Sequence, residues 1–111
     1  MSQERRRQRR TLAVTPAGLR TGRPEDAGEH LAVIRDASAT GAMLLARGNF
    51  AVGEELTLGI LFVVDQPVVD VTARVVRVET VTEGIWNAKL GVEFTPARPD
   101  LVPAFEKLVR G

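Results

Sequence analysis

The segment from Trp86 to Phe94 alternates apolar and polar residues without interruption, and this pattern constrains the fold more than any other feature of the chain. In a β-strand, residues of one parity share a face, so all the apolar side chains of this segment would lie together. The apolar set is Trp86, Ala88, Leu90, Val92 and Phe94. The segment is therefore expected to be a strand that is buried on one face.

Five further segments have the composition of short strands: residues 12–14, 31–35, 42–46, 56–64 and 68–79. The stretch from Gly18 to Glu29 combines Gly, Pro, Glu and Asp and is expected to be a loop. In the 68–79 segment the apolar parity changes after Val75, which predicts either a β-bulge or a strand covered on both faces. The second option is favoured, because a C-terminal helix would need apolar surface to cover.

The residues from about 100 onward predict that amphipathic helix. Asp100 is the expected N-cap, Pro103 is tolerated in the first turn, and an apolar stripe follows. The stripe consists of Leu101, Phe105, Leu108 and Val109. Six short strands and one terminal helix are typical of a small antiparallel barrel or sandwich.

Length and composition indicate one domain with a real hydrophobic core, since the chain has 111 residues of which 44% are hydrophobic. The sequence contains no cysteine and a single histidine, His30, so it offers neither a thiolate site nor a histidine cluster for a metal. Its longest apolar run, residues 60–64, is far shorter than the ~20 residues that cross a bilayer. These features predict a cytoplasmic protein without membrane insertion, metal or cofactor.

The first ten residues form a basic arm that cannot pack in a core and is expected to be mobile. It contains Arg5, Arg6, Arg7, Arg9 and Arg10, and it leaves the rest of the chain mildly acidic. Guanidinium groups match phosphate oxygens and the guanine edge. The charge is local rather than spread over a groove, which disfavours long nucleic acid as the partner and leaves a solubilising tail as the alternative role.

The second motif is the turn Asp36-Ala37-Ser38-Ala39-Thr40-Gly41, which joins the 31–35 and 42–46 segments. Ser38 can bond a ligand or hold the turn in shape, and Gly41 permits a positive φ or a close ligand approach. Asp and Ser commonly cap backbone amides in turns, so a structural role for Asp36 and Ser38 is the alternative.

These two motifs, in this order on an all-β frame, resemble the PilZ domain, a bacterial receptor module for cyclic di-GMP. That family has an RxxxR motif before its first strand and a D/N-x-S-x-x-G motif at the turn between its second and third strands. Arg6 and Arg10 fit the first motif, with Arg10 next to the strand that begins at Thr11. Arg5 and Arg9 have the same spacing, so the register stays open, and Arg5, Arg7 and Arg9 are secondary candidates. Gly91-Val92-Glu93-Phe94 is also similar to a late strand of the family.

The resemblance implies a six-stranded antiparallel split β-barrel with a C-terminal α-helix over residues 11–111, preceded by a flexible arm over residues 1–10. It also implies that Arg6 and Arg10 wrap cyclic di-GMP by bonding phosphates and stacking on a base. In the same site Asp36 would accept hydrogen bonds from guanine, Ser38 would bind phosphate or base, and Gly41 would admit the ligand. The chain shows no pairing of a nucleophile with a base, so a binding protein is expected rather than an enzyme.

The leading hypothesis is a cyclic di-GMP receptor that signals to an unidentified effector protein through ordering of its arm. The alternative is a PilZ-like adaptor that binds no nucleotide and acts by protein contacts in motility or pilus machinery. A nucleic-acid-binding barrel is disfavoured, because the chain has five aromatic residues in all and an acidic body. Whether the chain forms a homodimer, and whether one ligand or a stacked pair binds, stays open at this point.

Overall fold

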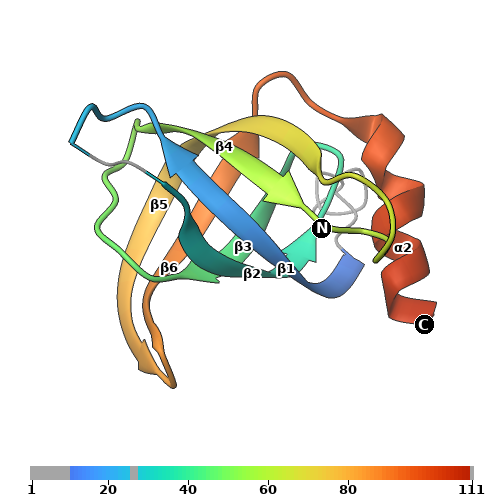
Figure 1. Ribbon diagram of the computed structural model, residues 1–111, viewed down its shortest axis with the longest axis horizontal. Coiled ribbons are helices and arrows are strands. Elements are labelled where there is room, and N and C mark those ends of the chain that lie inside the picture. The colour runs from blue at the N-terminus through green and yellow to red at the C-terminus, as the bar shows by residue number, and fades with distance from the viewer. Residues whose placement is uncertain (1–10, 26–27, 111) are drawn as a thin grey trace, which may run out of the picture.

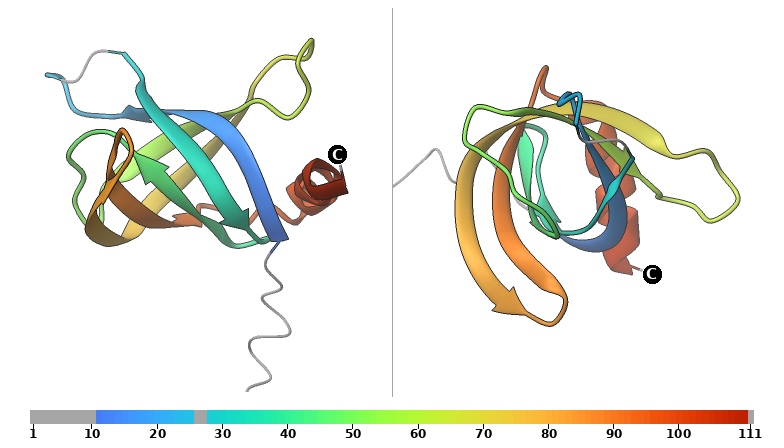
Figure 2. Two further views of the ribbon diagram at one scale, coloured as in Figure 1. Left: turned by 90° about the horizontal axis from the view of Figure 1, so that it is seen from below. Right: turned by 60° about the vertical axis from the view of Figure 1, so that its left-hand side comes forward.

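The computed structural model describes residues 11–25 and 28–110, which form a closed antiparallel barrel followed by a helix (Figure 1). The elements are β1 (Thr11–Thr21), β2 (His30–Ala37), β3 (Gly41–Ala46), β4 (Glu55–Ile60), β5 (Val69–Glu83), β6 (Trp86–Phe94), η1 (Pro99–Leu101) and α2 (Val102–Arg110). The strand order is β1-β2-β3-β6-β5-β4, and pairing of β1 with β4 closes the ring, which Figure 2 shows in its right-hand view. The predicted six-stranded barrel with a C-terminal helix is confirmed. The predicted basic arm lies outside the described residues.

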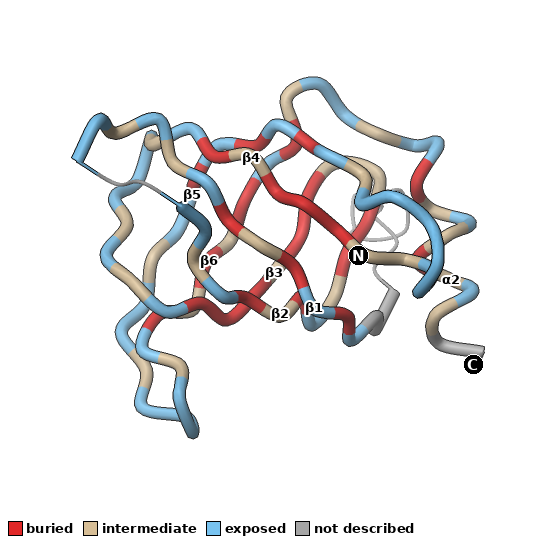
Figure 3. Tube along the Cα trace, viewed as in Figure 1, coloured by how far each residue is buried: buried red, intermediate tan, exposed pale blue. Residues whose placement is uncertain are grey.

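Alternate residues of every strand fill the barrel interior, which Figure 3 shows as buried stretches along the strands. Leu19, Ile34, Leu44, Leu58 and Leu90 are each 0% exposed and come from five different strands. The alternation that predicted β6 is confirmed, since four of its five apolar residues are buried and only the first, near the hairpin, is half-buried. Closing the sheet through β1 and β4 pairs the strand edges from Ala17 to Thr21.

Strand β1 is longer than the sequence predicted, and it continues through Pro16 to Thr21. Pairing with β4 begins at Ala17, so at Pro16 β1 is paired with β2 only, which is a position where a strand tolerates proline. The loop expected from Gly18 to Glu29 is therefore shorter, because its first residues belong to β1. Strand β4 in turn ends at Ile60, and residues 61–68 form a loop.

A β-bulge in β5 explains the change of apolar parity. The pairing with β6 moves from Val75 opposite Val92 to Arg77 opposite Gly91, which leaves Val76 as the extra residue. Val76 is 51% exposed, whereas Val75 is buried. The favoured prediction, a strand covered on both faces, is wrong, and helix α2 packs mainly against β1 instead.

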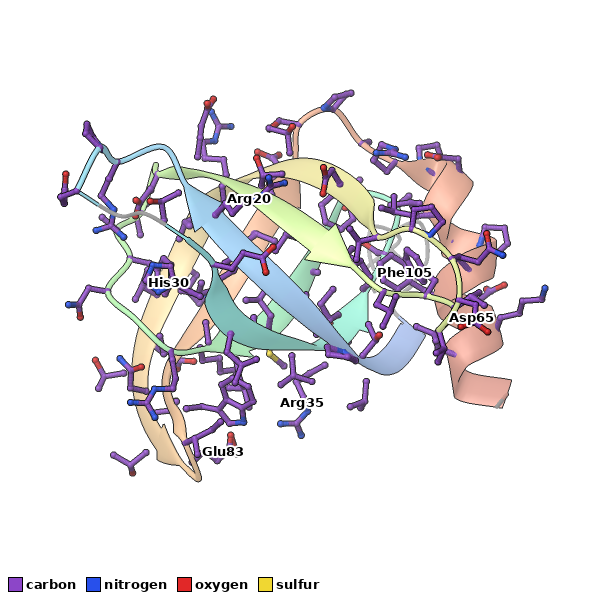
Figure 4. All side chains as sticks on the ribbon, in the orientation of Figure 1. Arg20, His30, Arg35, Asp65, Glu83 and Phe105 are labelled. Carbon is purple, nitrogen blue, oxygen red and sulfur yellow. The ribbon has the colours of Figure 1, made fainter. Side chains whose placement is uncertain are left out.

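Helix α2 closes one end of the barrel, and its residue Phe105 points toward the core in Figure 4. The Phe105 ring is 1% exposed and meets Phe62 edge to face, with ring centroids 5.0 Å apart.

The prediction of Asp100 as N-cap is wrong, because Asp100 lies inside η1 and α2 begins at Val102. The guanidinium of Arg98 donates to the Asp100 carboxylate at 2.9 and 3.0 Å, and this hydrogen bond lowers the pKa of Asp100. Within the described part of the chain, no helix has the length and apolarity needed to cross a membrane.

Candidate functional site

The turn between β2 and β3 is held by its own hydrogen bonds. The Ser38 side chain is buried at 4% exposure, and the Ser38 amide donates to the Gly41 carbonyl at 2.8 Å. The Ser38 hydroxyl accepts from the Thr40 amide at 3.3 Å and lies 3.2 Å from the Thr40 hydroxyl. Ser38 therefore stabilises the turn itself, as a short hydroxyl side chain commonly does.

Gly41 brings the turn close to β6. It pairs with Glu93, and a Cβ at this position would collide with the carbonyl oxygen of Val92. The positive φ considered for Gly41 is absent, because the glycines with positive φ in the described residues are Gly28, Gly48, Gly53 and Gly84. The requirement for glycine here comes from the packing of the β3 and β6 backbones.

Asp36 stands where the chain enters the barrel. It is half-buried near the end of β2, opposite Leu12 of β1 and Met43 of β3. The first residue of β1, Thr11, pairs with Ala37. The basic arm is therefore joined to the barrel one position from Asp36, whereas the predicted arginines lie outside the described residues: Arg5, Arg6, Arg7, Arg9 and Arg10.

A pocket of about 360 Å³ opens on the outer face of the barrel beside Asp36. Its base runs across β3, β6 and β5, where Gly91 pairs with Met43 on one side and with Arg77 on the other. A Cβ at Gly91 would lie 3.4 Å from the Cβ of Arg77, so the glycine keeps the middle of the pocket open. The bulge at Val76 lies in the same wall, as bulges often do beside binding sites.

Two cations and two carboxylates line this pocket. Arg77 and Lys89 supply the positive charges, while Asp36 and Glu79 supply the negative ones. Lys89 and Glu79 are 3.7 Å apart with both side chains well exposed, so solvent weakens their attraction. Arg77 and Lys89 can therefore donate hydrogen bonds to an anion, and the Asp36 carboxylate can accept hydrogen bonds from a nucleobase.

Arg77, Lys89 and Gly91 also line the pocket, and none of them was predicted from the sequence as a site residue. From the sequence alone, Arg77 is indistinguishable from any other solvent-exposed charge. The bulge at Val76 determines on which face of the sheet Arg77 lies, and the sequence does not fix that bulge. The available signal was Gly91, since an isolated glycine in an alternating strand often marks a close approach or a binding surface.

The turn is also tied to the C-terminal segment. The Phe94 amide donates to the Thr40 carbonyl at 2.8 Å, and the Arg98 amide donates to the Ala39 carbonyl at 2.7 Å. Arg98 in turn accepts from the Leu101 amide at 3.1 Å, at the start of the helical segment. A short run of backbone hydrogen bonds therefore connects the candidate site with the base of α2.

No metal centre is formed by the residues that the structure describes, because they contain no group of three potential ligands. His30 Nδ1 lies 3.1 Å from the Arg47 carbonyl, and its ring packs edge to face on Phe50. His30 therefore packs at the start of β2, at the opposite end of that strand from Asp36 and its pocket.

The fold and the site define a small β-barrel binding module, with a rigid turn and an open charged pocket on its outer face. The chain belongs to the PilZ domain family, which it matches over residues 4–111. This is a family of cyclic di-GMP receptors, and its members are binding or adaptor domains rather than enzymes.

A solved structure shares the fold: the Bacillus subtilis inhibitor of motility (MotI/DgrA) is similar with a TM-score of 0.66 and 21% sequence identity. The match covers 91% of this chain and 48% of the other, so this chain corresponds to about half of that protein. A search of curated proteins found no match.

Proposed function

We propose that this protein is a bacterial cyclic di-GMP receptor in which the basic arm and the β2–β3 turn enclose the nucleotide. The observation that carries the proposal is the pairing of Thr11 with Ala37, because it attaches the arginine motif beside Asp36 and the pocket. The five residues from Arg6 to Arg10 span at most about 18 Å when extended, which is enough to reach across a pocket of this kind. The choice of cyclic di-GMP as the ligand rests on membership in the PilZ domain family.

The residue roles follow from the chemistry of the ligand, which has two phosphates and two guanines. Arg6 and Arg10 would bind phosphate and the guanine edge, and a guanidinium can also stack on a base. Asp36 would accept hydrogen bonds from the guanine N–H donors. Arg77 and Lys89 would add positive charge at the opposite wall of the pocket.

Output would pass to a partner protein, because binding orders the arm and changes the surface around the turn. Motility machinery is among the expected partners, since the structurally similar Bacillus subtilis protein is named an inhibitor of motility. Only the name of that protein supports motility machinery as the partner. At 21% sequence identity, the similarity between the two proteins shows a shared fold and nothing more.

Calorimetric titration with cyclic di-GMP tests the proposal, with GTP and cyclic GMP as control ligands. Wild-type protein should bind cyclic di-GMP selectively. The Arg6→Ala/Arg10→Ala variant should lose roughly 100-fold or more in affinity, because it removes two charge-assisted contacts. Asp36→Ala should lose about tenfold or more, since guanine donors would be left unpaired. Circular dichroism should show that the variants keep the wild-type fold.

The matched control is Arg5→Ala/Arg9→Ala, which removes the same charge at the same spacing. A small loss in this variant would assign the motif to Arg6 and Arg10, and a larger loss than in the first variant would assign it to Arg5 and Arg9. Absence of any heat with wild-type protein would reject the receptor proposal and favour the adaptor that acts without nucleotide.

A further inference from the structure

An apolar groove of about 500 Å³ lies between α2 and the loop that joins β4 to β5. Phe62 and Val63 form the loop wall, and Ala104, Lys107 and Leu108 form the helix wall. The groove is a stable part of the fold, because Phe62 packs edge to face on a buried phenylalanine of α2. It is separate from the pocket beside Asp36, with which it shares no residue.

A turn over residues 63–66 stands next to this groove and carries an unusual tip. The Gln66 amide donates to the Val63 carbonyl at 3.0 Å, so Val64 and Asp65 are its central residues. Val64 is 83% exposed, more than any other large hydrophobic residue that the structure describes. Figure 2 shows that the loop carrying this turn projects outward from the barrel, and Val63 joins the turn to the groove wall. An apolar tip beside an apolar groove is typical of a protein-binding surface, because exposed apolar residues are usually scattered singly.

We propose that the groove binds the 63–66 turn of a second copy of this chain, in a symmetric dimer. Val64 of each copy would fill the groove of the other, and Asp65 would lie against Lys107, which has the opposite charge on the groove wall. Because the tip and the groove are neighbours on one surface, a single two-fold axis forms both contacts at once. The N-terminal arm does not suit the groove, since Met1 is the only apolar residue among its first ten.

Sedimentation velocity over a wide concentration range, on the full chain without nucleotide, tests this proposal independently of ligand binding. Wild-type protein should form a reversible dimer. Val64→Asp should raise the dissociation constant by more than roughly tenfold, because each dimer contains the altered contact twice and each buries a charge. Val52→Asp is the matched control, since Val52 is also an exposed valine (66%) but lies on another loop, and this variant should dimerise normally.

Charge reversal identifies the pairing itself. Asp65→Lys and Lys107→Asp should each weaken the dimer by roughly fivefold to tenfold, since two exposed ion pairs of modest strength are lost. The combined variant should return to within about threefold of wild type, because it restores opposite charges at the same contact. A wild-type monomer at every concentration, normal dimerisation of Val64→Asp, or failure of the combined variant to recover would each overturn the proposal.

Discussion

At the scale of single residues, Gly41 shows that a motif glycine can be required by the barrel before any ligand arrives. Gly41→Ala should lower the free energy of unfolding by about 1–3 kcal/mol, because its Cβ would overlap the Val92 carbonyl and force the β3 and β6 backbones apart. Urea unfolding measures this change. Gly22→Ala is the control, since a Cβ there meets nothing within 4 Å, and its stability should stay within about 0.5 kcal/mol of wild type. Equal stabilities for the two variants would contradict this account of Gly41.

At the scale of elements, α2 is part of the barrel core rather than an appendage. Phe105→Ala should lower the free energy of unfolding by about 3–5 kcal/mol, because a fully buried ring is replaced by a cavity at the end of the barrel. Thermal and urea unfolding followed by circular dichroism would measure the loss. Glu106→Ala, at the next residue of the same helix, lies outside the buried core and should change stability by less than about 0.5 kcal/mol. A separate early transition of the helix, with the barrel intact, would show instead that α2 folds independently.

Only some elements of this fold could be predicted from the sequence. The alternation of β6 and the Asp36–Gly41 turn were predictable, because each depends on local periodicity or local turn chemistry. The sequence offered a bulge near Val75 as one of two options but could not choose between them, and it did not predict the extension of β1 through Pro16. Both features depend on which strand lies alongside and where its pairing begins. The same limit applies to the pocket: Asp36 was found from its motif, whereas Arg77 and Gly91 meet only through the register of β5 and β6.

At the scale of the whole molecule, one end of the barrel gathers the start of β1, the β2–β3 turn and the base of α2 (Figure 2). A nucleotide that binds the turn should therefore stabilise the backbone hydrogen bonds that join it to the C-terminal segment. The Phe94 and Arg98 amides report on them directly, because they donate to the Thr40 and Ala39 carbonyls. Saturating cyclic di-GMP should slow hydrogen exchange at these two amides by roughly tenfold or more, as local opening is suppressed.

The Gly53 amide supplies the comparison within the same molecule. It makes a similar loop hydrogen bond, 2.7 Å to the Val75 carbonyl, but it belongs to the loop between β3 and β4, at the other end of β3 from the turn. Its exchange should change less than about twofold, because an exposed loop opens locally without the rest of the barrel. Asp36→Ala protein should show no slowing at either end. Uniform slowing at Phe94, Arg98 and Gly53 would mean that the nucleotide stabilises the barrel globally, and that the link from the turn to α2 does not carry the signal.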